Sequence, residues 1–277
     1  HVEAVSAENQ EEGRSPQYWI DVAVANSLPQ VALENFCRVL YQDGFDVSRA
    51  RLDVVSDNDN GNVIILRALL SQVEGNTNDM ETMLATLETE LKRAKWLDPQ
   101  TASWVFEQFP WLGIARGEVL SALACLLHPI LAKENTLAYS KANIMGCVER
   151  YMGCAAKIAD LFLDRFNPDS PLDDAEFESR RQQLLDMFKA DVESTAANEV
   201  LAKMIDVVSC TLKTNLYMPD RYALGLRLDP TVMGEDYPEK PFGILFVHGR
   251  RFNGFHVRFR DISRGGLRLV TPANSEL

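Results

Sequence analysis

The chain has 277 residues, of which 46% are hydrophobic and 25% charged, so it can build a core and is not disordered over most of its length. Its length suggests two domains, or one domain with an appendage. The formal net charge is -12, and an acidic chain is repelled by phosphate backbones, which disfavours nucleic acid as a partner. No stretch reaches the roughly 18 uncharged apolar residues of a membrane span, so we expect no membrane partner. Residues 119–131 indicate a buried helix.

The charge is unevenly distributed along the chain. Residues 240–277 contain seven basic and two acidic residues, a net charge of +5, so the rest of the chain carries -17. A basic block at the end of an acidic chain predicts an anion site there. The alternative is a solvated strand face whose arginines pair with acids elsewhere in the fold.

The five cysteines predict reduced thiols. Their number is odd, and none forms a C-x-x-C pair in this long chain, which argues against a disulfide framework. Cys147 and Cys154 are seven residues apart and can share a helix face, but no further ligands complete a tetrahedral set. His128 stands beside Pro129 without an acid or a thiol at ligand spacing. We therefore predict no metal site.

The first elements in chain order predict a small α/β module. Residues 1–15 are polar and aperiodic, which indicates a tail or linker. Residues 18–25 are rich in aromatic and β-branched side chains, which favours a strand. Residues 49–54 and 63–69 predict two more strands around a turn. Two helices are also predicted. The apolar face of the first is formed by Leu33, Phe36, Cys37 and Leu40, and the second is capped at its start by Asp79.

The resulting β-α-β-β-α order, over residues 16–97, resembles an ACT-like domain, a family of regulatory and assembly modules. ACT domains that bind amino acids usually place a glycine in the loop after the first strand. Residues 25–29 contain no glycine, which makes close approach of the backbone to a ligand harder. We therefore favour a scaffold role for this module over effector binding.

Helical periodicity then covers residues 98–215, and strand patterns follow in residues 216–277. Within the helical region we expect Pro129 to kink or break a helix. Residues 222–228 and 255–259 alternate, and residues 242–247 form a continuous apolar run typical of a buried strand. Residues 229–239 are rich in proline and acids and predict a loop. The overall class is α+β.

The most informative motif is R-G-G-L-R at residues 264–268. Gly265 and Gly266 follow a strand and allow the backbone to approach a ligand closely. Arg264 and Arg268 supply planar, permanently charged groups that match carboxylates or phosphates in a bidentate manner. The chemistry predicts a site for a small anion, most naturally a carboxylate. The alternative is an ordinary glycine turn between two strands.

Other catalytic and binding motifs are missing from the sequence. It contains neither a G-x-G-x-x-G opening a helix nor a P-loop, and no G-x-S-x-G or Ser/His/Asp arrangement. Residues 254–259 superficially resemble the aromatic strand of RNA-recognition domains. However, one aromatic is lacking, and His256 stands where a small residue belongs.

The motif FHVRFRDISRGGLR, residues 255–268, closely resembles the large NAD-specific glutamate dehydrogenases of eukaryotic microbes. The resemblance is sharp over residues 212–270 and looser over residues 120–144. It implies that R-G-G-L-R corresponds to the K-G-G-x-R motif at that family's substrate pocket. Arg264 would then hold a substrate carboxylate where smaller dehydrogenases use lysine, Gly265 and Gly266 would leave space for glutamate, and Arg268 would support the site.

The resemblance also implies that much of the machinery lies downstream. The second substrate lysine, the catalytic lysine, the catalytic aspartate and the NAD-binding domain all follow K-G-G-x-R in the family. We therefore expect a fragment of an enzyme that oxidatively deaminates L-glutamate to 2-oxoglutarate and ammonium, with no catalytic or cofactor-binding residue in this chain and no activity of its own. Residues 216–277 would start the substrate domain.

The alternative function is a non-catalytic regulatory or oligomerisation module built on the ACT-like domain. Under both interpretations we expect a homo-oligomer. Reduced cysteines fit the mitochondrial matrix and the cytoplasm equally well.

Overall fold

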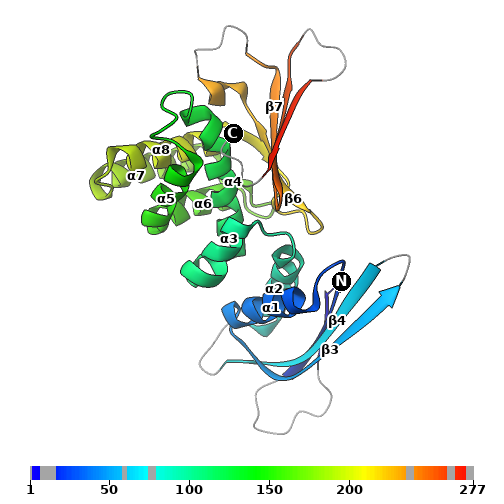
Figure 1. Cartoon of the computed structure of the whole chain (residues 1–277). Coiled ribbons are helices and arrows are strands. Elements are labelled where there is room, and N and C mark those ends of the chain that lie inside the picture. Colours follow the sequence, from blue (N-terminus) through cyan, green and yellow to red (C-terminus); the bar gives the residue numbers. More distant parts are fainter. Residues whose placement is uncertain are drawn as a thin grey trace. The chain divides into compact units, whose positions relative to one another are not determined.

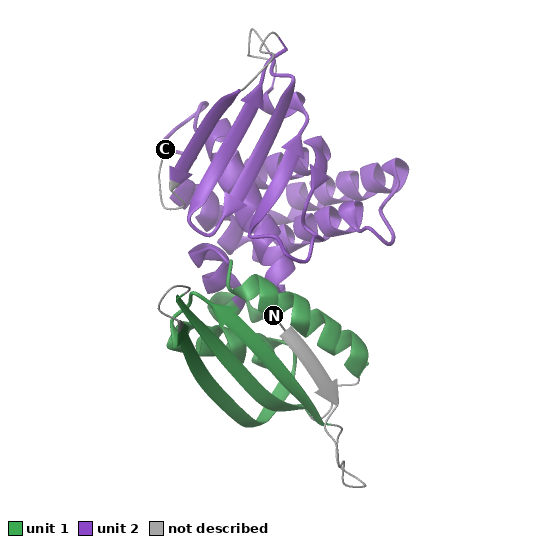
Figure 2. Cartoon of the chain, turned by 90° about the vertical axis from the view of Figure 1, so that its right-hand side faces the viewer, with its two compact units in different colours: residues 1–96, 106–111 green, residues 97–105, 112–277 purple. Residues whose placement is uncertain are grey.

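The computed structural model describes residues 2–6, 17–57, 61–73, 79–234, 240–260 and 266–272. It combines helices with two antiparallel sheets, which confirms the α+β class (Figure 1). The chain divides into two compact units (Figure 2). Unit 1 comprises residues 1–96 and 106–111, and unit 2 comprises residues 97–105 and 112–277.

Unit 1 consists of two helices and a four-stranded sheet whose strand order is β1-β2-β4-β3. After the first strand, its elements follow the predicted β-α-β-β-α order. They are β1 (Val2–Ser6), β2 (Gln17–Ala25), α1 (Pro29–Gln42), β3 (Phe45–Asp57), β4 (Gly61–Gln72) and α2 (Met80–Ala94). Asp79 caps α2 as predicted, because its carboxylate accepts from the Thr82 amide at 2.9 Å.

The first strand differs from the prediction. Residues 1–15 were expected to be a tail, yet β1 pairs antiparallel with β2, with Val2 opposite Val22 and Ser6 opposite Tyr18. The reason is tertiary. A stretch of five residues carries little strand signal of its own, but the free edge of β2 offers it a row of hydrogen-bonding partners.

The buried face of α1 is also rotated from the predicted one. Leu33 is 38% exposed and Cys37 is exposed, so neither belongs to the core. The buried side chains are Ala32, Phe36, Val39 and Leu40. Both stripes contain Phe36 and Leu40, so periodicity alone could not choose between them.

Unit 2 consists of a helical layer and a five-stranded sheet of order β5-β6-β7-β8-β9. The helices are α3 (Pro99–Ser103), α4 (Ile114–Leu131), α5 (Lys141–Arg150), α6 (Met152–Phe166), α7 (Asp174–Asp191) and α8 (Thr195–Cys210). A π-helix at Trp104–Gln108 and a 3-10 turn at Pro110–Leu112 each include residues of both units. The strands are β5 (Thr211–Thr214), β6 (Ala223–Leu228), β7 (Gly243–Gly249), β8 (Phe252–Arg258) and β9 (Leu267–Pro272).

Two boundaries in unit 2 correct the sequence prediction. The helical region was expected to reach residue 215, but α8 ends at Cys210 and Thr211–Thr214 pair with β6 as an edge strand. The predicted loop 229–239 contains a short 3-10 helix at Pro230–Met233. Each is a short stretch whose conformation depends on neighbouring elements more than on local propensity.

Helix α4 is the centre of the unit 2 core. Most of its side chains are buried, including Leu120, Leu123 and Leu127, which confirms the predicted buried helix. It is the one helix among the described residues that is apolar and long enough to cross a bilayer, but 78% of it is buried in the fold, which is typical of a core helix. Pro129 does not break it, because α4 ends at Leu131, within one turn.

The sheet of unit 2 has one face against the helices and one face away from them. Leu226 on β6, Phe246 on β7 and Phe255 on β8 lie opposite one another and face the helical layer. The alternate residues form the outer face, and Figure 2 shows that face toward the viewer with the helices of unit 2 behind it.

Candidate functional site

The R-G-G-L-R segment ends within β9 of unit 2. Arg264 and Gly265 fall outside the described residues. Gly266 immediately precedes β9, and Arg268 lies within β9, directly opposite His256 of β8. The structure therefore places two of the four predicted substrate residues at the edge strand of the sheet.

Gly266 packs closely against β8. A Cβ atom at this position would lie 2.6 Å from Nε2 of His256 and 2.6 Å from the carbonyl oxygen of Val257. No side chain fits at such distances, so the position requires glycine. The His256 Nε2 atom behind it is buried and has no hydrogen-bond partner among the described residues. The close approach in the structure is to the neighbouring strand, and the predicted approach to a ligand stays a prediction.

Arg268 is exposed on the outer face of the sheet. Arg258 on β8 is exposed as well. The ion pairs found in the described part of the chain involve neither guanidinium, so the alternative of a strand face neutralised by distant acids is not what these residues form. Both can offer bidentate hydrogen bonds to an anion.

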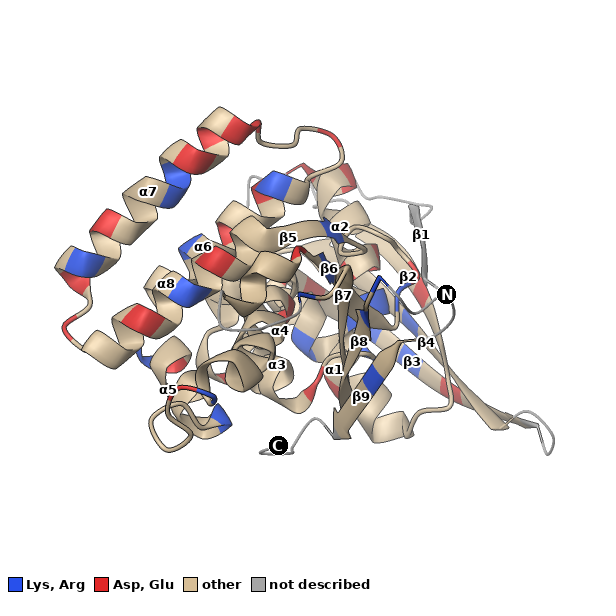
Figure 3. Cartoon of the chain, turned by 90° about the horizontal axis from the view of Figure 1, so that it is seen from above, with Lys and Arg blue, Asp and Glu red and all other residues tan. Residues whose placement is uncertain are grey.

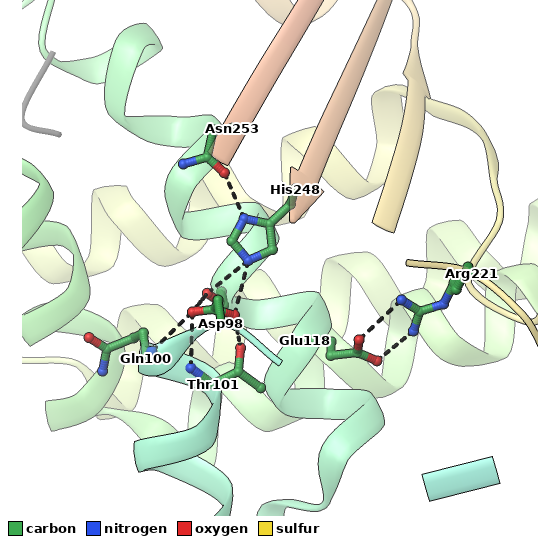
Figure 4. A network of polar contacts seen from close by, with 8 residues as sticks. Asp98, Gln100, Thr101, Glu118, Arg221, His248 and Asn253 are labelled. Carbon is green, nitrogen blue, oxygen red and sulfur yellow. Dashed lines mark hydrogen bonds and ion pairs between the residues drawn. The ribbon is translucent and has the colours of Figure 1, made fainter. Parts of the chain in front are cut away.

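A second polar cluster lies on the opposite face of the same sheet and was not predicted. His248 on β7 contacts Asp98, the N-cap residue of α3, with 3.1 Å between His248 Nε2 and Asp98 Oδ2 (Figure 4). The other ring nitrogen, Nδ1, is 2.7 Å from Oδ1 of Asn253 on β8. Asp98 also accepts hydrogen bonds from Thr101 and from Ser121 of α4. The cluster ties two strands to two helices.

The pKa values of this pair favour a full ion pair. Burial alone would lower the pKa of His248, but the hydrogen bond and charge of Asp98, together with the contact with Cys125, outweigh it and raise that pKa to about 10. Burial would raise the pKa of Asp98, but hydrogen bonds from His248 and Thr101 outweigh it and lower that pKa to about 2. Near neutral pH, His248 is therefore a cation that donates from both ring nitrogens.

This cluster contains serine, histidine and aspartate but is not a catalytic triad. In a triad, aspartate orients one ring nitrogen and serine donates to the other. Here Ser121 Oγ, at 3.3 Å, and Asp98 Oδ2 lie at the same atom, His248 Nε2. All three residues are buried, so no substrate reaches the serine. The cluster is a structural clamp between the sheet and the helical layer.

A second buried ion pair involves Glu118, which lies on the same face of α4 as Ser121, three residues earlier. Arg221, which precedes β6, donates from Nη1 to Oε1 of Glu118 at 3.0 Å and from Nη2 to Oε2 at 2.5 Å. Figure 4 shows the two side chains facing each other. The Arg221 and Glu118 side chains are only 4% and 10% exposed. The Nε atom of Arg221 donates to the carbonyl of Leu216. Two paired charges therefore fix the sheet against the core helix.

Sequence signals for these clamps existed but were incomplete. Asp98 precedes Pro99, which is a helix-start pattern. His248 extends the apolar run of β7 at an inward position, and a polar residue there requires a partner. The partner is 150 residues away in the chain, so the local pattern could not identify it.

Comparison with known proteins shows which family part of this chain resembles. Residues 184–274 match a family model described as the catalytic domain of bacterial NAD-glutamate dehydrogenase. The expected resemblance to NAD-specific glutamate dehydrogenases is confirmed. The match covers α8, all five strands of the unit 2 sheet and the R-G-G-L-R segment at residues 264–268.

Individual relatives agree with the family model. The NAD-specific glutamate dehydrogenase of Saccharomyces cerevisiae is 48% identical over 24% of this chain, and glutamate dehydrogenase 2 of Dictyostelium discoideum is 37% identical over 34%. A probable NAD-specific glutamate dehydrogenase of Schizosaccharomyces pombe is 27% identical over 54% of the chain. The matched part of this chain spans 6%, 9% and 15% of those three proteins.

Proposed function

We propose that this chain is part of an NAD-dependent glutamate dehydrogenase, which oxidatively deaminates L-glutamate to 2-oxoglutarate and ammonium. The similarity of residues 184–274 to the family's catalytic domain carries the proposal. The chain spans only a small part of the relatives, so the activity belongs to the larger protein. In that protein, unit 2 would supply the first sheet of the substrate domain.

The uncovered end of the unit 2 sheet supports this placement. Leu267 and Leu269 of β9 face the helical side but are 65% and 54% exposed. They line an apolar cavity of about 320 Å³ together with the end of α4 and residues of β7 and β8. Such exposed apolar surface requires a cover in a folded protein, and further segments of the catalytic domain would supply it.

We propose that the R-G-G-L-R segment at residues 264–268 binds the substrate. Glutamate and 2-oxoglutarate each carry two carboxylates, and a guanidinium pairs with a carboxylate through two parallel hydrogen bonds. We assign Arg264 to hold one substrate carboxylate and so to position the substrate for hydride transfer. Gly265 and Gly266 keep the backbone close, and Arg268 supports the site from β9.

The described residues do not fit the NAD cofactor. Dinucleotides bind at the carboxyl ends of parallel strands in a β-α-β unit, whereas both described sheets are antiparallel at every pairing. We therefore assign no step of the hydride transfer to this chain's own residues. The cofactor domain of the parent protein would lie elsewhere.

The decisive experiment compares arginine variants in the complete enzyme. Arg264→Ala should raise the KM for glutamate by about 10- to 100-fold, because a charged hydrogen-bond pair of about 1.5–3 kcal/mol is lost. Arg264→Lys should restore part of the affinity as a point charge. Arg251→Ala, at the exposed β7–β8 turn, is the matched control. An unchanged KM in Arg264→Ala would contradict the assignment.

The isolated chain should have no activity. Mixed with glutamate and NAD, it should produce no NADH absorbance above that of a blank, whereas the complete enzyme should. Measurable turnover by the 277 residues alone would mean that the catalytic residues lie within this chain, against our proposal.

For unit 1 we propose an ACT-like scaffold. Its element order supports the likeness, and the loop after β2 is filled by the chain's own contacts. The Asn26 amide donates to the Asn62 carbonyl at 2.9 Å, and Lys95 Nζ donates to the Ala25 carbonyl at 2.6 Å. Asn26 supplies the positive φ, 52°, that a glycine often supplies. Calorimetric titration with free amino acids should detect no binding; saturable heat would favour the alternative, a regulatory module.

The compartment is a separate proposal. All five cysteines are free thiols in the fold, which supports a reducing environment, the mitochondrial matrix or the cytoplasm. Fractionation of the source cells with matrix and cytosolic markers tests it, and recovery in a secreted fraction would contradict it.

A further inference from the structure

The imidazole ring of His256 lies where the side chain of residue 266 would be if that residue were not glycine. His256 is on β8, on the outer face of the unit 2 sheet. A Cβ atom added to Gly266 would lie 2.6 Å from Nε2 and 2.9 Å from Cδ2 of its ring. These two atoms form one edge of the imidazole, so that edge packs against the backbone at Gly266. The histidine and the glycine are therefore complementary in shape.

Neighbouring strands hold the ring in this place. The cross-strand neighbours of His256 are Leu245 on β7 and Arg268 on β9, and directly paired residues point to the same side of a sheet. Figure 3 shows β9 beside β8, with basic residues in blue. His256 is partly buried, whereas both of its neighbours are exposed. An imidazole has only two side-chain torsions, so a ring packed among these neighbours acts as a stiff spacer.

The contact distinguishes Gly266 from the glycines of β7 and β8. At Gly254, two residues before His256, an added Cβ would find its nearest neighbour at 3.8 Å, an ordinary contact. At Gly243 nothing lies within 4 Å, and at Gly249 the nearest atom, 2.9 Å away, belongs to a side-chain ring. Of these four positions, Gly266 is the one where a Cβ would meet both a ring and a backbone oxygen, each at 2.6 Å. A change at His256 therefore acts directly on the predicted substrate motif.

Filling space does not by itself account for a histidine at this position. Nε2 of His256 is buried and has no hydrogen-bond partner among the described residues. Leaving a buried polar atom unpaired is costly, so such atoms nearly always have a partner. A leucine would occupy similar space without that cost. The nitrogen is at the point where R-G-G-L-R enters β9, so a hydrogen bond made there in the complete enzyme would hold the segment as well as pack against it.

We propose that His256 is a positioning residue for the glutamate site: its ring fixes the backbone at Gly266 and, through it, the guanidinium of Arg264 two residues earlier. The inference rests on the proposed function, which assigns one substrate carboxylate to Arg264. A bidentate guanidinium–carboxylate pair needs two N–H groups aimed at two oxygens. A displacement of about 1 Å in such a site can cost about 100-fold in rate. His256 acts through Arg264 and not on the substrate, since its Nε2 atom is buried.

Steady-state kinetics of the complete enzyme test the positioning role. His256→Ala should raise the KM for glutamate about 5- to 10-fold, because Arg264 loses its support, and should leave the KM for NAD unchanged within about twofold. His256→Gln keeps a hydrogen-bonding group near the position of Nε2 and should restore most of the affinity. His256→Leu fills the space without that group and should stay impaired. Leu245→Ala, on the other side of the ring, is the matched control and should keep the wild-type KM.

A double-mutant cycle with Arg264 shows whether His256 acts through it. In the Arg264→Ala background no guanidinium is left to position, so adding His256→Ala should change the KM for glutamate by less than about twofold. A general folding defect would not depend on Arg264 in this way, and thermal unfolding of each variant measures it separately. If His256→Ala raised the KM by the same factor with and without Arg264, the residue would act by another route and the inference would be wrong.

A second cycle exchanges space between the two residues in contact. Gly266→Ala should raise the KM for glutamate, and Gly266→Ala/His256→Ala should lower it again in part, because the added Cβ then enters space that the ring has left. The Val257 carbonyl oxygen stays in place, which limits the recovery. Gly254→Ala makes the same change two residues before His256 and should keep the wild-type KM. Two losses that simply multiplied in the double variant would overturn the inference.

The outcomes separate this inference from the proposed function. If Arg264→Ala raises the KM for glutamate and His256→Ala does not, the positioning role is wrong and the substrate assignment stands. If Arg264→Ala itself leaves that KM unchanged, the assignment fails, and the inference fails with it. If His256→Ala does not fold, His256→Gln and His256→Leu decide the question, and an equal KM in both would overturn the positioning role.

Discussion

Asp43, at the end of α1, is a residue whose charge state should govern the stability of unit 1. Its carboxyl shares a hydrogen bond with Glu90 of α2, and its Oδ2 atom is buried without a partner among the described residues. Burial, followed by the nearby charge and hydrogen bond of Glu90, raises the pKa of Asp43 to about 8. The two carboxyls therefore share a proton near neutral pH.

This raised pKa predicts a pH dependence. The ordinary value is 3.8, so the favourable contribution is present below pH 3.8 and is lost as pH rises toward about 8. Asp43→Asn should remove that loss and stabilise unit 1 by about 1–2 kcal/mol at pH 8, with a smaller gain at pH 5. Urea unfolding at both pH values measures it, with the exposed Asp46→Asn as control. Equal effects at pH 5 and pH 8 would contradict the shared proton.

In unit 2 the raised pKa of His248 reflects a charged form that the fold favours, whereas in Asp43 the fold disfavours the charged form. The pKa of His248 is raised from 6.5 to about 10, so the stabilisation is present below pH 6.5 and is lost as pH rises through about 10. Asp98, with its pKa lowered to about 2, loses its contribution as pH falls from 3.8 through about 2. The stabilisation from this pair is thus fully present between pH 3.8 and 6.5, although both groups stay charged in the folded protein from about pH 2 to about pH 10.

Breaking this pair should be costly. His248→Gln leaves the Asp98 carboxylate buried without its counter-charge, so the free energy of unfolding at pH 6 should fall by about 3–5 kcal/mol. The difference from the wild type should shrink at pH 10. His256→Gln, on the outer face, serves as the comparison in chemical denaturation. If both variants behaved alike, the clamp would not contribute as described.

At the scale of elements, β9 depends on the glycine before it. Gly266→Ala places a Cβ against His256 and the Val257 carbonyl, so β9 must shift from β8 at a cost of about 1–3 kcal/mol. Gly243→Ala, on β7, has open space and should cost less than about 1 kcal/mol. Amide hydrogen exchange of β9 resolves the effect, which His256→Ala should relieve only in part. Unchanged protection in Gly266→Ala would refute the tight contact.

At the scale of the whole molecule, the chain has two separate cores. Leu70 and Leu87 are fully buried in unit 1, while Leu123 and Phe246 are fully buried in unit 2. Calorimetry should therefore resolve two transitions. Leu87→Ala should lower the free energy of unfolding of unit 1 by about 2–5 kcal/mol, and so shift the transition of that unit to lower temperature. Leu123→Ala should do the same to the transition of unit 2. A single transition that both variants lower equally would show that the units unfold as one.

Local chemistry in the sequence was sufficient for much of this protein. Alternation and helical periodicity predicted β2 through α2 and the buried helix α4, because each pattern reports one face of one element. The motif at residues 255–268 pointed to glutamate dehydrogenases, since a long specific motif carries family information without any structure. The predicted role of Arg264 remains a prediction, as Arg264 lies outside the described residues.

Tertiary structure decided the features that depend on distant partners. Strand β1 exists because β2 has a free edge, and the buried stripe of α1 includes Val39 because of the sheet beneath it. The clamp between Asp98 and His248 joins residues 150 positions apart. Lys213, Arg227 and Arg268 come into one row of the sheet only when five strands align in one register. Burial and cross-strand neighbours are properties of the folded chain, and one-dimensional patterns cannot specify them.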